Sequence, residues 1–148
     1  MDRRTTILYV DDNPRSSRLL AGVLEQCGFR VTAKTDPAEA LVLCRRASFD
    51  LALLDYEMPG MSGSQLAREL KCQTPDLPVV LISGRAELPL TDLEFVDAHF
   101  GFGTSLDDLL WSLRILTAPR VFVPEPSVQH HRSFGSMPFR ESRWSDST

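Results

Sequence analysis

The sequence predicts a doubly wound α/β fold with a five-stranded parallel sheet, and three segments of similar form carry this prediction. Each is a short apolar run that ends in polar residues: 7–10 before Asp11 and Asp12, 51–54 before Asp55, and 79–82 before Ser83. Unbroken apolar runs are typical of parallel strands that are covered by helices on both faces. Because such strands end at one edge of the sheet, their polar ends should meet in a single crevice.

Helix signals separate these strands. Asn13 and Asp36 are each followed by a proline, which suits an N-cap and the first helical position. Apolar residues then recur at helical spacing, and Gly28 ends the first of these helices. We expect strands at 5–10, 29–34, 50–55 and 79–82, with helices beginning at Pro14, Pro37 and Ser64. This alternation favours right-handed crossovers and a parallel sheet.

The signals weaken after Ser83. Pro89 interrupts the next segment, so only a short helix at about 91–97 is expected. Residues 99–102 are the expected fifth strand, although the glycine within it makes a poor strand residue. Ser105 then caps a clear last helix, whose apolar stripe is Leu109, Leu110, Leu113 and Leu116. The expected domain therefore covers 1–117.

Composition narrows the function classes. A chain of 148 residues suits one domain with an appendage. Its net charge of −4 argues against a nucleic-acid partner, which would need a basic surface. No apolar run approaches the ~20 residues of a membrane span, and no signal peptide is visible. Because Cys27, Cys44 and Cys72 form no Cys-x-x-Cys pair, we expect buried, reduced thiols in a cytoplasmic protein without membrane contact.

The composition changes after Thr117. Residues 118–148 mix prolines, serines and arginines without a period, which predicts a disordered tail. A partner-binding peptide is an alternative, because aromatic and basic residues are interspersed there. His130 and His131 supply too few ligands for a metal site on their own. The tail also lacks a helix-turn-helix pattern, so the output should be a partner protein, self-association or the tail itself.

Asp11, Asp12 and Asp55 would repel one another at one edge, so they need a cation or a proton between them. Oxygen ligands of this kind select a hard ion such as Mg²⁺. With Mg²⁺ bound, Asp55 would stay ionised as a nucleophile, and the Ser83 hydroxyl could contact a phosphoryl oxygen. Each feature also has a simpler explanation when taken alone. Asp11 or Asp12 could complement the N-terminus of the first helix, Asp55 could cap a loop, and Ser83-Gly84 could start a turn. Their joint occurrence favours phosphoryl transfer onto Asp55.

Together these motifs resemble the receiver domain of two-component response regulators over about residues 5–117. The resemblance rests on Asp11-Asp12, on Asp55 with Met58-Pro59-Gly60-Met61-Ser62-Gly63, and on Ser83-Gly84. It implies a flavodoxin-like fold of three α/β/α layers. It also implies Asp55 as phosphoacceptor and Ser83 as a phosphoryl contact. Asp11, Asp12, Asp55 and the Glu57 backbone carbonyl would hold Mg²⁺, and a histidine kinase or histidine phosphotransfer protein would be the donor.

One position departs from the family pattern. Receiver domains carry a lysine at the end of the fifth strand, where Phe102 falls when the last helix is aligned from Ser105. The only two lysines, Lys34 and Lys71, belong to other segments. His99 falls at the position of the switch aromatic. Arg85 is a weak substitute for the lysine, because a planar guanidinium does not mimic an ammonium. The resemblance therefore predicts a weakened phosphorylation switch.

Three function classes compete. The first is a stand-alone phosphoaccepting receiver that signals through protein contacts, and we expect no enzyme activity from it. The second is a pseudo-receiver that acts as an interaction or dimerisation module without phosphorylation, a homodimer included. The third is a phosphatase of the haloacid-dehalogenase type. That class expects Asp-x-Asp, whereas Glu57 stands at the second position after Asp55, and it expects a lysine that this chain lacks.

Overall fold

A computed structural model describes residues 3–101 and 103–119 of the chain, and residues 1–118 form one compact unit. The five strands are all parallel, in the order β2-β1-β3-β4-β5. The strands are β1 (Thr6–Val10), β2 (Arg30–Lys34), β3 (Leu51–Asp55), β4 (Val79–Ile82) and β5 (Ala98–Phe100). The helices are α1 (Pro14–Gln26), α2 (Pro37–Arg46), α3 (Gly63–Gln73) and α4 (Leu106–Thr117). The predicted doubly wound five-stranded parallel fold is confirmed.

The predicted caps form the helix starts. The Asn13 side chain accepts hydrogen bonds from the N–H groups of Arg15 and Ser16, and the next residue is a proline in the first turn of α1. Asp36 caps α2 in the same way. Ser62 and a glutamine three residues later form a reciprocal capping box at α3. Local sequence thus fixes where each helix leaves the carboxyl edge of the sheet.

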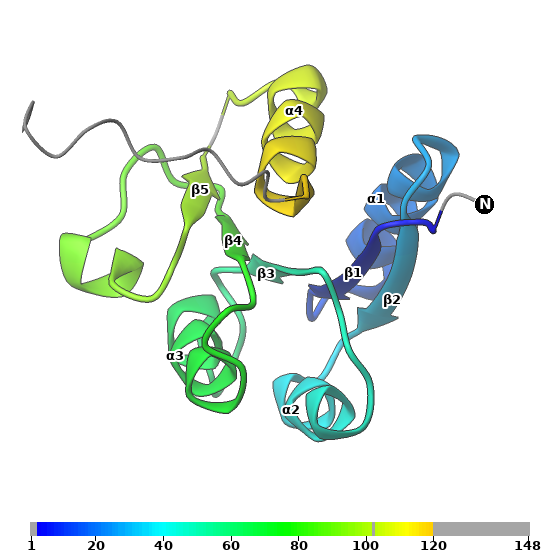
Figure 1. Cartoon of the computed structure of the whole chain (residues 1–148). Coiled ribbons are helices and arrows are strands. Elements are labelled where there is room, and N and C mark those ends of the chain that lie inside the picture. The colour runs from blue at the N-terminus through cyan, green and yellow to red at the C-terminus, as the bar shows by residue number, and fades with distance from the viewer. Residues whose placement is uncertain (1–2, 102, 120–148) are drawn as a thin grey trace, which may run out of the picture. The chain divides into compact units, whose positions relative to one another are not determined.

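Two apolar layers cover the faces of the sheet. Alternate residues of β1 and β3 point to opposite faces, as a period of two requires. One face packs against α2 and α3, and the other packs against α1 and α4, as Figure 1 shows. The side chains with no exposed surface include Leu8, Leu54 and Leu81 on the first face and Ile7, Leu53 and Leu113 on the second. This three-layer core makes the sheet a rigid base for its polar edge.

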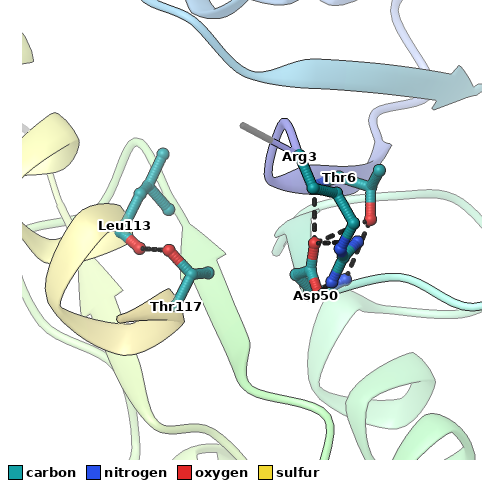
Figure 2. Close-up of polar contacts among 5 residues, drawn as sticks. All are labelled: Arg3, Thr6, Asp50, Leu113 and Thr117. Carbon is teal, nitrogen blue, oxygen red and sulfur yellow. Dashed lines mark hydrogen bonds and ion pairs between the residues drawn. The ribbon is translucent and has the colours of Figure 1, made fainter. Parts of the chain in front are cut away.

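The amino edge of the sheet is held by a polar cluster around Asp50 (Figure 2). Its carboxylate accepts the Thr6 N–H at 2.8 Å and the Arg3 guanidinium at 2.8 Å. Partial burial alone raises the pKa of Asp50, but the hydrogen bonds from Thr6 and Arg3 outweigh it and lower that pKa.

A side-chain hydrogen bond closes the last turn of α4. The Thr117 hydroxyl donates to the Leu113 carbonyl at 2.7 Å (Figure 2).

The segment between β4 and β5 differs from the prediction. The expected helix at about 91–97 is a single 3₁₀ turn, η1 (Leu90–Leu93), and the expected strand at 99–102 is β5 at Ala98–Phe100. Asp97 explains both differences, because its carboxylate accepts the Val79 N–H at 2.8 Å and its own N–H donates to the Val79 carbonyl. The chain must therefore return from Ser83 to the start of β4 by residue 97, which leaves room for one short turn.

The predicted burial of the cysteines is partly wrong. The three thiols are free, and Cys27 and Cys44 are partly buried. Cys72 is exposed, because α3 packs through Leu66, Ala67 and Leu70, and residue 72 lies on the opposite side of the helix. Within residues 3–101 and 103–119, no helix has the length and apolar character needed to cross a membrane. The predicted disordered tail, apart from Ala118 and Pro119, lies outside the described residues.

Candidate functional site

Asp11, Asp12 and Asp55 meet at the carboxyl edge of the sheet. Asp11 and Asp12 follow β1, and Asp55 is the last residue of β3, the neighbouring strand. One oxygen from each carboxylate lies within 4.8 Å of the others. Three carboxylates at this spacing repel one another unless a proton or a cation lies between them.

Asp11 is the most firmly held of the three. Only 7% of its surface is exposed, and it accepts the Tyr9 hydroxyl at 2.8 Å and the Asn13 N–H at 2.9 Å. Burial raises the pKa of Tyr9, and the bond to Asp11 raises it further, so the hydroxyl remains a donor. The sequence analysis missed Tyr9. The alternation of side chains along a strand could have revealed this contact, because it places residues 9 and 11 on the same face of the sheet.

The Pro/Gly loop after β3 fixes Asp55 through a close backbone contact. The Gly63 N–H donates to the Tyr56 carbonyl at 2.9 Å. A Cβ at position 63 would lie 2.4 Å from the Asp55 carbonyl oxygen and 2.9 Å from Leu81. Gly60 has a φ of +84°, a conformation that favours glycine. Gly60 and Gly63 let the start of α3 approach the end of β3 closely, as the short loop between Asp55 and Gly63 requires.

The electrostatics of the site suit a divalent cation. Burial, followed by the charges of Asp11 and Asp12, raises the pKa of Asp55 to about 7, although the hydrogen bond from the Glu57 N–H acts to lower it. The donor set consists entirely of carboxylate oxygens on adjoining strand ends. Mg²⁺ prefers oxygen ligands and commonly uses one or two carboxylates with waters and phosphate oxygens. The residues at this edge therefore fit Mg²⁺.

Ser83 lies at the end of β4, next to the strand that carries Asp55. It is 5% exposed, and its N–H donates to the Phe100 carbonyl at 2.9 Å. Its hydroxyl oxygen accepts the Arg85 N–H at 2.9 Å. The Ser83 side chain therefore already shapes the turn that follows β4, and its hydroxyl hydrogen remains available to a further acceptor.

The residues immediately after Asp55 contact the segment that follows β4. The Glu57 carboxylate pairs with Arg85 Nε at 3.2 Å, and the Arg85 guanidinium lies 5.6 Å from the centre of the Tyr56 ring. The Tyr56 hydroxyl donates to the Asp92 carboxylate in η1. We call these four residues the edge network. No local sequence pattern pointed to Asp92.

The two residues predicted for the switch lie at or beyond β5. His99 is exposed in the middle of β5, in register with Leu81 of β4. Phe102 lies outside the described residues, so its place at the usual lysine position stays a prediction. The two lysines are elsewhere: Lys34 ends β2, and Lys71 in α3 pairs with Asp97 at 2.8 Å.

A cavity of about 430 Å³ adjoins the carboxylates on the α1 face of the sheet. Asp11 and Asp55 line its polar end, and the remaining lining residues are Tyr9, Ser16, Leu19, Leu20, Val23 and Ile82. Leu19, one of these lining residues, is 68% exposed. The acidic site thus opens toward solvent beside an apolar surface of α1.

Comparison with known families decides the identity of this domain. The family model of the response regulator receiver domain matches residues 7–98. This chain belongs to that family. The match covers the carboxylates at the ends of β1 and β3 and Ser83, and it ends at the first residue of β5.

Curated relatives support the same assignment. The C4-dicarboxylate transport transcriptional regulatory protein DctD of Pseudomonas aeruginosa is 36% identical over 122 residues, which are 77% of this chain and 26% of DctD. The sensory transduction protein RegX3 of Mycobacterium tuberculosis is 36% identical over 81 residues, or 55% of this chain and 35% of RegX3. The receiver chain thus spans about a quarter to a third of the length of these relatives.

Solved structures show the same fold. The response regulator TrrA of Thermotoga maritima, solved in complex with Mg²⁺ and BeF, is 27% identical with a TM-score of 0.71. The match covers 76% of this chain and 98% of TrrA. TrrA in complex with the histidine kinase ThkA matches with a TM-score of 0.70, covering 77% of this chain and 99% of TrrA. Receiver domains of this family pair with histidine kinases, as that complex illustrates.

Proposed function

We propose that this receiver domain accepts a phosphoryl group on Asp55 and signals through protein contacts in the cytoplasm, without enzyme activity of its own. The observation that carries the proposal is the meeting of three carboxylates within 4.8 Å at the ends of β1 and β3. The donor would be a histidine kinase or a histidine phosphotransfer protein, in line with the kinase complex of TrrA.

The chemistry follows from the placement of Asp55. Its carboxylate oxygen attacks the phosphorus of a phosphohistidine; the new P–O bond forms as the P–N bond breaks, and the imidazole leaves with the electron pair and takes up a proton. Mg²⁺ held by Asp11, Asp12, Asp55 and the Glu57 carbonyl would neutralise the carboxylates and the incoming phosphoryl oxygens. Ser83, beside Tyr56, would donate its hydroxyl to a phosphoryl oxygen.

The raised pKa of Asp55, about 7, bears on its reactivity. Near neutral pH a large fraction of this carboxyl carries a proton as long as only protein charges surround it, and a protonated carboxyl is a poor nucleophile. A cation between Asp11 and Asp55 lowers that pKa again. Phosphorylation of this receiver should therefore require Mg²⁺.

The test is labelling with acetyl phosphate, followed by intact mass. The natural chain should gain one phosphoryl group in Mg²⁺ and none in EDTA, and Asp55→Asn should gain none. Asp50→Asn is the matched control, because Asp50 lies at the opposite edge of the sheet and should leave labelling unchanged. Equal labelling of Asp55→Asn and the natural chain would reject Asp55 as the acceptor.

Two features favour a weakened switch in this receiver or, as the second candidate, a pseudo-receiver that acts without phosphorylation. Only one 3₁₀ turn lies between β4 and β5, and the sequence places Phe102 at the usual lysine position. We therefore propose a weakened switch, with little change in fold or association after phosphorylation. Amide exchange across 83–101 should change little on labelling, and Phe102→Lys should enlarge the change. Strong protection changes in the natural chain would contradict the weakened switch.

A further inference from the structure

We propose that Arg85 is the phosphoryl-binding cation of this receiver, exchanging its Glu57 partner for the phosphoryl group on Asp55. This inference rests on the proposed function, because it concerns the same acceptor. Receiver domains make this contact with a lysine at the end of the fifth strand, where this sequence has Phe102. The inference assigns the contact to an arginine on the β4–β5 segment instead. Four observations carry it: the backbone position of Arg85, its present partner, its aromatic support and the placement of the lysines.

The backbone of Arg85 is held beside the acceptor strand. Its N–H donates to the Ser83 hydroxyl oxygen at 2.9 Å. Its carbonyl oxygen lies 2.4 Å from where a Cβ at Gly101 would be, so only a glycine at the end of β5 allows this approach. The backbone of Arg85 therefore lies between the ends of β4 and β5, at the carboxyl edge that also carries Asp55.

The side chain of Arg85 is already directed toward the residues that follow Asp55. Its Nε donates to the Glu57 carboxylate at 3.2 Å, and the Glu57 N–H in turn donates to Asp55 Oδ1 at 3.4 Å. The Tyr56 ring supports the guanidinium at 5.6 Å. Glu57 thus holds the guanidinium two residues from the acceptor, on the surface of the loop that leaves β3.

The exchange of partners is favourable on charge and geometry. Arg85 and Glu57 are both about half exposed in their pair, at 56% and 51%, and exposed ion pairs contribute little to stability. A phosphoryl group brings a charge of about −1.5 to −2 and three strong acceptor oxygens. A guanidinium binds such oxygens with two parallel hydrogen bonds, which the single Nε contact to Glu57 does not provide.

The lysines of this chain are placed where they cannot make this contact without leaving their segments. Lys71 pairs with Asp97 next to the start of β4, at the opposite edge of the sheet. Lys34 ends the edge strand β2, which is separated from β3 by β1. Arg85 also packs on Tyr56, whose hydroxyl donates to Asp92 in η1.

The experiment measures beryllofluoride affinity at saturating Mg²⁺ by ¹⁹F NMR in the full chain. Arg85→Gln should bind beryllofluoride about tenfold more weakly, because it loses a charge-assisted bidentate contact. Arg15→Gln is the matched control at the first turn of α1 and should stay within about twofold. Mg²⁺ affinity without beryllofluoride, measured by calorimetry, should be the same for all variants at positions 15 and 85.

A double-mutant cycle isolates the exchange itself. Glu57→Gln should strengthen beryllofluoride binding about threefold, partly because a competing partner is removed and partly because a negative charge is lost. In the Arg85→Gln background only the charge effect remains, so the gain should shrink. An additive cycle, or an Arg85→Gln affinity equal to that of the natural chain, would overturn the role of Arg85 and leave the acceptor intact. A natural chain that neither binds beryllofluoride nor labels at Asp55 would overturn the proposed function and this inference with it.

Discussion

The carboxyl edge of this receiver domain has two halves that are held together differently. On the β1–β3 half, Asp11 is buried and bonded to Tyr9 and Asn13, and Gly63 packs directly on the Asp55 carbonyl. On the β4–β5 half, the contacts are the surface edge network and a strand of three residues. Buried contacts preorganise the acceptor site, whereas exposed contacts can exchange partners at low cost.

The difference bears on how signalling can work in this domain. A nucleophile must be held in place before reaction, so close packing around Asp55 is consistent with its proposed role. A responding segment must have two arrangements of similar free energy. The segment from Gly84 to Asp97 meets that need better than the β1–β3 half, because its links to the site are exposed side chains, but the proposed weakened switch predicts that its response to phosphorylation is small.

The largest expected effect concerns two glycines with the same close contact. Gly63→Ala and Gly101→Ala each place a Cβ 2.4 Å from a backbone oxygen. Gly63 faces the buried end of β3, so its variant should lose about 3 kcal/mol of unfolding free energy. Gly101 faces the carbonyl of Arg85 in an exposed segment that can shift, so its loss should be about 1 kcal/mol. Urea denaturation measures both.

Gly84→Ala is the control for this pair. Its Cβ would lie 3.9 Å from Glu57, an ordinary contact, so stability should change by less than about 0.5 kcal/mol. Equal losses at Gly63 and Gly101 would show that the two halves of the edge are equally rigid.

A pair of tyrosines sharpens the comparison. Tyr9→Phe leaves a buried oxygen of Asp11 without its donor and should cost about 2 kcal/mol in unfolding free energy. Tyr56→Phe removes the bond to Asp92 at the surface and should cost less than about 1 kcal/mol. Amide exchange should nevertheless become faster in η1 of the Tyr56 variant. The comparison is wrong if Tyr56→Phe is the more costly of the two.

Metal binding should depend on the β1–β3 half alone. Asp12→Asn removes one of the three clustered carboxylates and should weaken Mg²⁺ binding about tenfold by calorimetry. Asp92→Asn, on the other half, is the control and should leave Mg²⁺ affinity within about twofold. Unchanged affinity in Asp12→Asn would remove Asp12 from the site.

The smallest expected effect is a pH dependence of stability in EDTA. The pKa of Asp55 is about 7 in the folded state, above its unfolded value of 3.8. The stabilisation of the folded state by protonated Asp55 is therefore fully present below about pH 4 and is lost as the pH rises toward 7. Between pH 5 and 8 the free energy of unfolding of the natural chain should fall by on the order of 1 kcal/mol more than that of Asp55→Asn, after allowance for solvent screening. Urea midpoints at the two pH values measure this, and Mg²⁺ should abolish the difference.

The sequence by itself determined the topology and the acidic edge. The apolar runs ending in Asp11, Asp55 and Ser83, with the Asn-Pro and Asp-Pro helix starts, carry that information in neighbouring residues. A carboxylate directly after a parallel strand can lie only at the carboxyl edge of the sheet. Local patterns of this kind need no knowledge of distant contacts.

Only the tertiary structure decided the β4–β5 half. Whether residues 91–97 form a helix depends on Asp97 bonding to Val79, eighteen positions earlier in the chain. The partners of Arg85 and Asp92 likewise come from the loop after β3. Such contacts join segments that are distant in the sequence, and exposed polar side chains carry no periodic signal that would reveal them. The acceptor site can therefore be predicted from its strands, whereas its link to the rest of the fold requires the structure.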